Sequence, residues 1–174
     1  MPKLISGRSA LVDSRGSILQ VVKATSTTAV STTTHRSYVE IDNLTLTTKG
    51  ANSSFLVMGT AHAYSANSTG AMARATLGFQ IGSTFIAGMN GNPGDSWGHD
   101  VRASGGHINR HITTDQTYAI GTSLTFRLMG ATWDANYTNP PSNTVHDPVV
   151  FTWGSNAGQL YGHESVLTVM EIAN

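Results

Sequence analysis

The sequence predicts an all-β protein: an antiparallel, jelly-roll-like β-sandwich that forms a single domain with a short N-terminal arm. Roughly eight apolar or alternating stretches are separated by turns rich in Gly, Asn and Ser. No helical periodicity extends beyond about ten residues. The 174 residues fit one domain, and only 11% of them are charged, against roughly 25% in an average soluble domain. Such a composition favours β-structure, and it also favours a chain that buries surface in an assembly.

The most apolar strands lie near the two ends of the predicted sandwich. Residues 18–24 and residues 165–172 are almost entirely apolar or β-branched and contain no Gly or Pro. This pattern is typical of a strand that is covered on both faces. We therefore expect these strands to pair centrally or to lie against a neighbouring subunit. Leu167 and Met170 should point to opposite faces, and both should be buried.

The chain is divided into an N-terminal arm, residues 1–16, and the sandwich domain, residues 17–174. The arm shows no periodic element and is either frayed or laid against a partner. Residues 25–35 form a low-complexity Thr/Ser run, which we interpret as a loop or an exposed edge. Residues 38–46 predict a strand whose apolar alternation changes phase near Asn43, which indicates a bulge.

The middle strands are recognised by their alternation. Residues 55–64 place the small side chains of Gly59, Ala61 and Ala63 on one face, as expected beneath a closely approaching sheet or subunit. Further strands are predicted at residues 72–82, 84–86, 118–133 and 149–153. Two long stretches, residues 88–106 and 134–148, are predicted as loops with a functional or interfacial role.

Composition excludes several classes of function. The chain has no cysteine, so disulfides, zinc-thiolate sites and cysteine nucleophiles are excluded. Its net charge of zero gives no electrostatic signature of a nucleic acid or an anionic membrane as partner. No apolar run reaches the roughly 20 residues that span a bilayer, and the N-terminus does not resemble a signal peptide. We expect a protein that is made in the cytoplasm and not exported.

Residues capable of metal binding or catalysis form no specific pattern. Among the seven histidines, His107 and His111 share an i, i+4 spacing. On a strand that spacing separates them by about 13 Å, too far for one ion. Symmetry in a trimer offers the alternative that copies of one histidine meet on an axis. Because no nucleophile, metalloprotease or nucleotide-binding motif occurs, we predict no metal, no cofactor and no enzymatic activity.

Three segments carry a resemblance to a known group. They are residues 18–25 (ILQVVKAT), residues 49–58 (KGANSSFLVM) and residues 165–173 (SVLTVMEIA). Together they resemble a β-sandwich module of tailed-bacteriophage virion structural proteins, either head decoration (cement) proteins or tail fibres. The resemblance implies a homotrimer and no catalytic residue, because the group's motifs are structural.

Within this resemblance, the short arm favours a trimeric capsid decoration or cement protein that stabilises the head, with the major capsid protein lattice as partner. The arm has basic and small apolar side chains suited to docking: Leu4, Ile5, Arg8, Leu11, Val12 and Arg15.

The alternative is a tail-fibre or receptor-binding (adhesin) head domain, whose partners are tail proteins and a host surface glycan. In that case Trp97, which lies in a glycine-rich loop, is the expected glycan contact. A carbohydrate-binding module or an enzyme is the third candidate.

Overall fold

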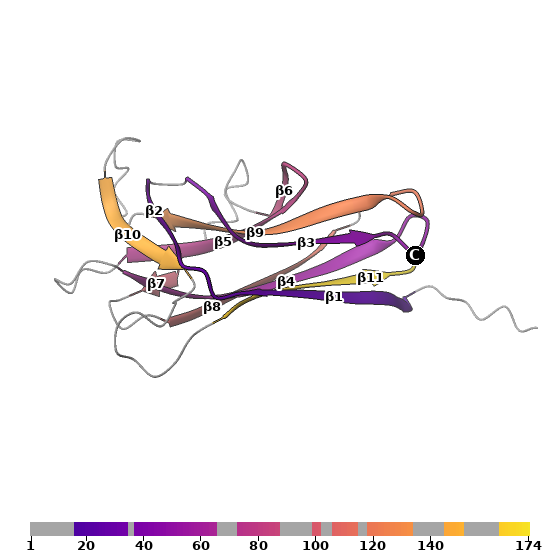
Figure 1. Cartoon of the computed structure of the whole chain (residues 1–174), viewed down its shortest axis with the longest axis horizontal. Helices are drawn as coiled ribbons and strands as arrows, with labels where there is room; N and C mark the ends of the chain where they lie inside the picture. The colour runs from indigo at the N-terminus through magenta and orange to yellow at the C-terminus, as the bar shows by residue number, and fades with distance from the viewer. Residues whose placement is uncertain are drawn as a thin grey trace, which may run out of the picture.

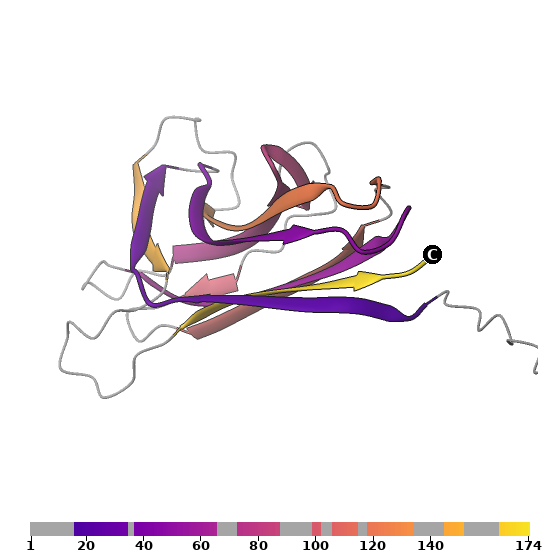
Figure 2. The same cartoon turned by 45° about the vertical axis from the view of Figure 1, so that its right-hand side comes forward.

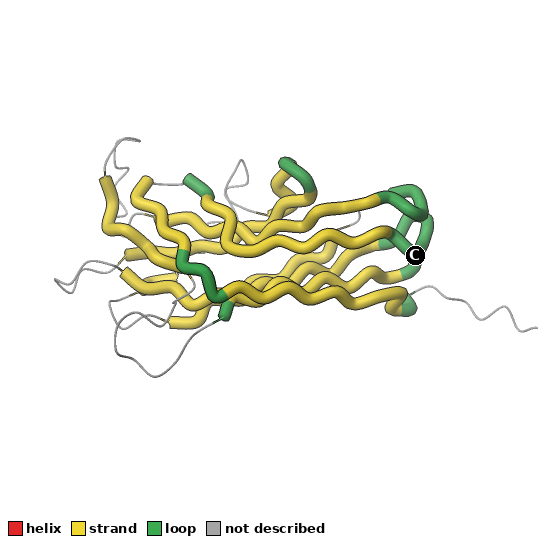
Figure 3. Tube along the Cα trace, in the orientation of Figure 1, coloured by secondary structure: helices red, strands yellow, loops and turns green. Residues whose placement is uncertain are grey.

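The structure is a computed structural model that describes residues 16–34, 37–65, 73–87, 99–101, 106–114, 118–133, 145–151 and 164–174. These residues form eleven β-strands arranged in two layers, and the described part of the chain contains only strands and loops (Figures 1 and 3). The all-β prediction is confirmed.

The first sheet has six strands, and its order is β1-β11-β4-β10-β2, with β8 also paired to β4. The bounds of its strands are β1 (Ile18–Ser26), β2 (Val30–Thr34), β4 (Ser54–Ser65), β8 (Gly106–Thr114), β10 (Val145–Phe151) and β11 (Ser165–Ile172). The second sheet has five strands in the order β3-β9-β5-β6, with β7 also paired to β5. Its strands are β3 (Val39–Thr47), β5 (Ala73–Ile81), β6 (Thr84–Ala87), β7 (His99–Val101) and β9 (Ser123–Trp133).

The pairings are nested in sequence. Strand β1 pairs with β11, β3 with β9, β4 with β8, and β5 with β6 and β7, always antiparallel. The chain can be described as one long hairpin that is rolled up. Successive strand pairs along this hairpin then fall alternately in the first and the second sheet. That is the jelly-roll arrangement of two packed sheets. The predicted sandwich is therefore confirmed, and β2 and β10 are additions to it.

The core consists of the inward-facing side chains of both sheets. Phe55, Val57, Leu167 and Val169 of the first sheet are fully buried, and so is Phe126 of the second sheet. Leu44, Leu77, Phe79 and Leu128 belong to the same cluster of buried side chains. Period-two alternation is what allows each strand to contribute every second residue to this core.

Two glycines mark positions where the sheets approach most closely. A Cβ on Gly59 would lie 2.5 Å from Cδ1 of Leu128 and 2.7 Å from Cε1 of Phe79. A Cβ on Gly130 would lie 2.7 Å from the ring of Phe151. The small face of β4 therefore lies against the opposite sheet, one of the two arrangements that its sequence predicts.

One end of the sandwich is closed by β10 and β2. Both strands belong to the first sheet, yet β10 contacts β9 and β5, and β2 contacts β9 and β3 (Figures 1 and 2). Phe151 of β10 is fully buried as a result. Bending part of one sheet toward the other covers the end of the core with an aromatic side chain.

Several predicted elements differ from the observed ones. Residues 106–114 form a full strand, β8, and residues 99–101 form β7, although both were assigned to loops or left unassigned. Strand β10 begins at Val145, inside the predicted loop 134–148. Residues 118–122 form a turn, so that β9 begins only at Ser123.

Two further predictions concern the first strands. The low-complexity run contains the end of β1 and all of β2, and β2 is the outermost strand of its sheet, as an exposed edge should be. The bulge in β3 is confirmed, but the register shifts between Glu40 and Asp42 rather than at Asn43. The arm, residues 1–16, lies outside the described residues except for Gly16.

Candidate assembly surface

The outward face of β1, β11 and β4 in the first sheet is largely apolar, whereas the neighbouring strand β8 exposes His107, Asn109, His111 and Thr113. In β11, the side chains of Leu167, Val169 and Glu171 are buried on the core side, while Met170 and its outward neighbours are half-buried. The register places Met170 between Val21 of β1 and Leu56 of β4. Figure 1 shows these three strands side by side. Met170 and Leu167 thus point to opposite faces, as the sequence predicts.

We call the outward apolar side chains of β1, β11 and β4 the apolar face. Ile18 and Val21, on the edge strand β1, are 59% and 52% exposed. The others are half-buried between neighbouring strands. The apolar face consists of Ile18, Val21, Leu56, Met58, Val166, Met170 and Ile172.

Charge is scarce around this face. The other described outward positions of β1, β4 and β11 include Thr25, Thr60 and Thr168, and Lys23 is the one Lys, Arg, Asp or Glu among them. An apolar surface with few charges is typical of the centre of a protein–protein interface. The geometry suits association with another apolar protein surface.

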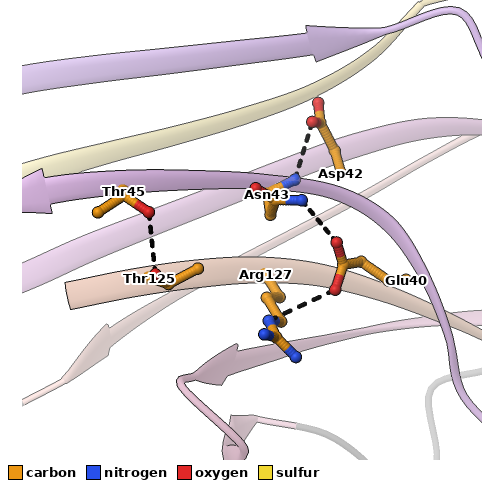
Figure 4. A network of polar contacts seen from close by, with 6 residues as sticks. All are labelled: Glu40, Asp42, Asn43, Thr45, Thr125 and Arg127. Atoms are coloured by element: carbon orange, nitrogen blue, oxygen red, sulfur yellow. Dashed lines mark hydrogen bonds and ion pairs between the residues drawn. The ribbon is translucent and has the colours of Figure 1, made fainter.

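The opposite outer face is polar by comparison. Strands β3 and β9 of the second sheet present hydroxyl, amide and charged side chains (Figure 4). Arg127 Nε lies 3.4 Å from a carboxylate oxygen of Glu40, and Asn43 Nδ2 donates a hydrogen bond of 2.6 Å to the same carboxylate. Thr45 and Thr125 share a hydrogen bond of 2.9 Å. These polar and charged groups contact one another across β3 and β9, so this surface has no comparable apolar character.

A buried carboxylate fixes the end of the sandwich beside the apolar face. Glu171 is fully buried and accepts hydrogen bonds of 2.9 Å from the backbone N–H groups of Lys49 and Gly50. Gln20 Nε2 donates to the other carboxylate oxygen and also to the backbone oxygen of Thr47. Burial raises the pKa of Glu171, but the hydrogen bonds from Gly50, Lys49 and Gln20 lower it by more, so the pKa falls below its ordinary value. The carboxylate joins β11, β1 and the turn after β3.

Strand β1 is the edge of the first sheet on this side. It pairs with β11 and, among the described residues, with no other strand. Backbone hydrogen bonds from Gly16 to Ala173 (2.7 Å) and from Ala173 to Ser17 (2.9 Å) extend this pairing to the start of the described chain. A long edge strand with exposed Ile and Val is a surface that natural proteins usually cover.

The histidines fall into an arrangement that the sequence did not reveal. His107 and His111 are both exposed on strand β8, as expected for i, i+4 residues on a strand, which keeps them too far apart for one ion. Instead His107 is opposite His62 of β4, with ring centroids 5.3 Å apart in an edge-on contact. No group of three or more His, Cys, Asp or Glu that would suit a metal occurs among the described residues.

The site residues predicted from the sequence lie outside the described residues. These are the arm residues Leu4, Ile5, Arg8, Leu11, Val12 and Arg15, together with Trp97. Alternation along residues 55–64 puts Leu56 and Met58 on the face opposite Gly59, Ala61 and Ala63, but it does not connect them with β11 and β1, because the sequence does not reveal which distant strands pair. Within the described part of the chain, no helix is long and apolar enough to cross a membrane.

No protein family and no curated protein matches the sequence. Among solved structures, a chain of the T13 particle of infectious bursal disease virus aligns with 89% of this chain at 10% identity and a TM-score of 0.47. A chain of T=1 particles derived from infectious bursal virus aligns with 100% of it at 13% identity and a TM-score of 0.45. This chain spans 36% and 40% of the length of those two chains. Likeness at this level assigns neither a family nor a partner.

Proposed function

We propose that this chain is a structural protein of a virus particle, and specifically a trimeric decoration or cement protein on the head of a tailed bacteriophage. The observation that carries the proposal is the apolar face, an outer surface on one sheet of a jelly roll with Lys23 as the one charged residue at the described outward positions of β1, β4 and β11. Jelly rolls are a common architecture of viral capsid domains and also of lectin domains. The resemblance of residues 18–25, 49–58 and 165–173 to phage virion modules favours the capsid setting.

The role proposed is mechanical rather than catalytic. A cement protein has to bury surface against its neighbours and hold them together, and it needs no nucleophile or cofactor. A core of packed aromatic and branched side chains supports this role, because close-packed interiors transmit strain instead of yielding to it. The expected partner is the major capsid protein lattice, and the expected location is the virion.

The N-terminal arm is proposed as the capsid contact. Residues 1–16 carry Lys3, Arg8 and Arg15 against Asp13, and they contain two small apolar clusters. Each Leu, Ile or Val that becomes fully buried on the capsid contributes roughly 1.5–3 kcal/mol before the cost of ordering the arm. Three arms on one trimer bind together, so the overall affinity for the capsid exceeds the affinity of a single arm.

The test uses undecorated heads and a deletion of residues 2–16. The full chain should co-sediment with the heads and raise their disruption temperature. The deletion variant should remain a trimer with an unchanged melting temperature but should stay in the supernatant. A double substitution of arm cations, Arg8→Ala and Arg15→Ala, should bind less tightly than the full chain at low salt and should lose less affinity as salt is raised. Equal binding by the deletion variant would contradict the arm as the contact.

A tail-fibre or adhesin domain is the second candidate, because lectin domains share this architecture and Trp97 lies in a glycine-rich stretch. This function predicts that the free protein binds host cells and that Trp97→Ala abolishes the binding. Binding to host cells, with no binding to heads, would favour the adhesin over the cement protein.

A further inference from the structure

We propose that the apolar face is the surface through which copies of this chain associate, with the edge strand β1 of one copy packed on β11 and β4 of the next. This inference rests on the trimer of the proposed function and gives that trimer a surface. It concerns contact between copies, whereas the arm is proposed to contact the capsid.

The size of the face fits an interface core. Three strands spaced about 4.8 Å apart and about 20 Å of strand length give a footprint of about 300 Å². The largest exposed apolar patch on a typical monomer is about 300–600 Å² and is often functional. A standard interface buries about 800 Å² on each partner, so polar positions around the face must form its rim. Thr25 and Thr60 occupy such positions, and Thr168 lies within the face between Val166 and Met170; none of the three carries a charge that burial would penalise.

The chemistry of the face selects a second copy as its occupant. An apolar surface requires a partner surface that is largely apolar and carries few charges. Lys23 on the edge strand β1 is the one charged residue at the described outward positions of β1, β4 and β11. Among the described residues, the outer β3–β9 surface does not meet this requirement, since Glu40 and Arg127 lie on it. The apolar face does meet it, so one copy complements another.

The distribution of exposure sets the direction of the contact. Ile18 and Val21 on β1 are each more than half exposed, whereas Met170 and Leu56 lie further into the sheet and are half-buried. The two parts of the face therefore differ, and the β1 part of one copy can pack on the inner part of the next. A contact between two different parts of a surface closes into a ring when its rotation allows, and three copies make the smallest such ring. The same contact covers the open edge of β1.

The first test compares two matched charge substitutions by light scattering across a range of protein concentrations. Val21→Glu places a carboxylate on the apolar face, and Thr47→Glu places one on an exposed outward position of β3. The unmodified protein and Thr47→Glu should be trimers. Val21→Glu should raise the concentration at which the trimer dissociates by at least about tenfold. Thermal melts at low concentration establish that each variant folds.

The second test does not depend on a disruptive substitution. Because the chain contains no cysteine, Val21→Cys and Thr47→Cys each introduce a single thiol. The thiol at position 21 should react slowly with a maleimide above the association concentration and quickly below it, while the thiol at position 47 should react quickly at both.

The outcomes separate this inference from the proposed function. A monomer at all concentrations, a trimer that Val21→Glu leaves intact, or equal reactivity of the two thiols would overturn the assembly surface. Those results leave capsid binding to be decided by co-sedimentation with heads. Conversely, a trimer that Val21→Glu dissociates supports the surface even if the protein binds no head.

Discussion

At the scale of single residues, Glu171 is the most informative side chain. It is a carboxylate on the core side of an otherwise apolar strand, and it is held there by backbone and side-chain donors. A single acid among Val, Leu, Met and Ile is visible in the sequence, but its hydrogen-bond donors lie more than a hundred residues away. Its burial could therefore not be predicted from the local pattern.

The substitution Glu171→Gln should destabilise the fold by about 2–4 kcal/mol at pH 7, because an amide nitrogen would face the N–H donors that the carboxylate now accepts. The pKa of Glu171 is lowered on folding from its ordinary 4.5. Its contribution is therefore complete above that ordinary value and is lost as the pH falls through the folded pKa. Urea unfolding at pH 7 and pH 3 should show a larger loss of stability for the unmodified protein than for the variant. Equal losses would contradict this account of Glu171.

The substitution Gly59→Ala tests the close approach of the two sheets. The added methyl would meet Leu128 and Phe79 from the opposite sheet, so the core must shift to admit it. We expect a loss of about 1–3 kcal/mol in the free energy of unfolding. Gly82→Ala is a control that separates backbone strain from crowding. A Cβ added at Gly82 would have no atom within 4 Å, but the φ of +61° would strain an alanine there. A silent Gly59→Ala substitution would show that the sheets lie further apart.

At the scale of elements, β11 shows what the sequence could predict. Its continuous apolar run correctly indicated a central strand with Leu167 and Met170 on opposite faces. The sandwich class, most of the other strands and the bulge in β3 were predicted from the alternation of apolar and polar residues. Strand β8 was missed because His107, Asn109, Arg110 and His111 interrupt the apolar pattern. In the structure Arg110 points between the sheets and donates a hydrogen bond of 2.7 Å to the backbone oxygen of Leu77.

Truncation of the two faces of β11 should have different consequences. Leu167→Ala opens a cavity in the core and should cost about 2–5 kcal/mol of unfolding free energy at every protein concentration. Met170→Ala removes a half-buried outward side chain, so at low concentration it should cost about 1 kcal/mol or less. If copies associate as proposed, it should cost more above the association concentration, because association then stabilises the fold. Denaturation at two concentrations makes the comparison. A concentration-independent effect of Met170→Ala would argue against the assembly surface.

At the scale of the whole molecule, the two outer surfaces of the jelly roll have different characters. One is a network of paired polar groups, and the other is the apolar face beside the edge strand β1. The asymmetry arises from pairing between the two ends of the chain, which brings residues 18–26 against residues 165–172. Sequence patterns identified both strands as apolar on two sides, but only their register with β4 unites them in one surface.

Under the proposed function, this chain is a component of a virus particle and decorates its head. Quantitative mass spectrometry of purified particles, with the major capsid protein as internal standard, tests it most directly. The account predicts hundreds of copies per particle, in a fixed ratio to the capsid protein and in multiples of three. A few dozen copies would contradict head decoration and identify a tail component, and absence from the particles would contradict a virion role altogether.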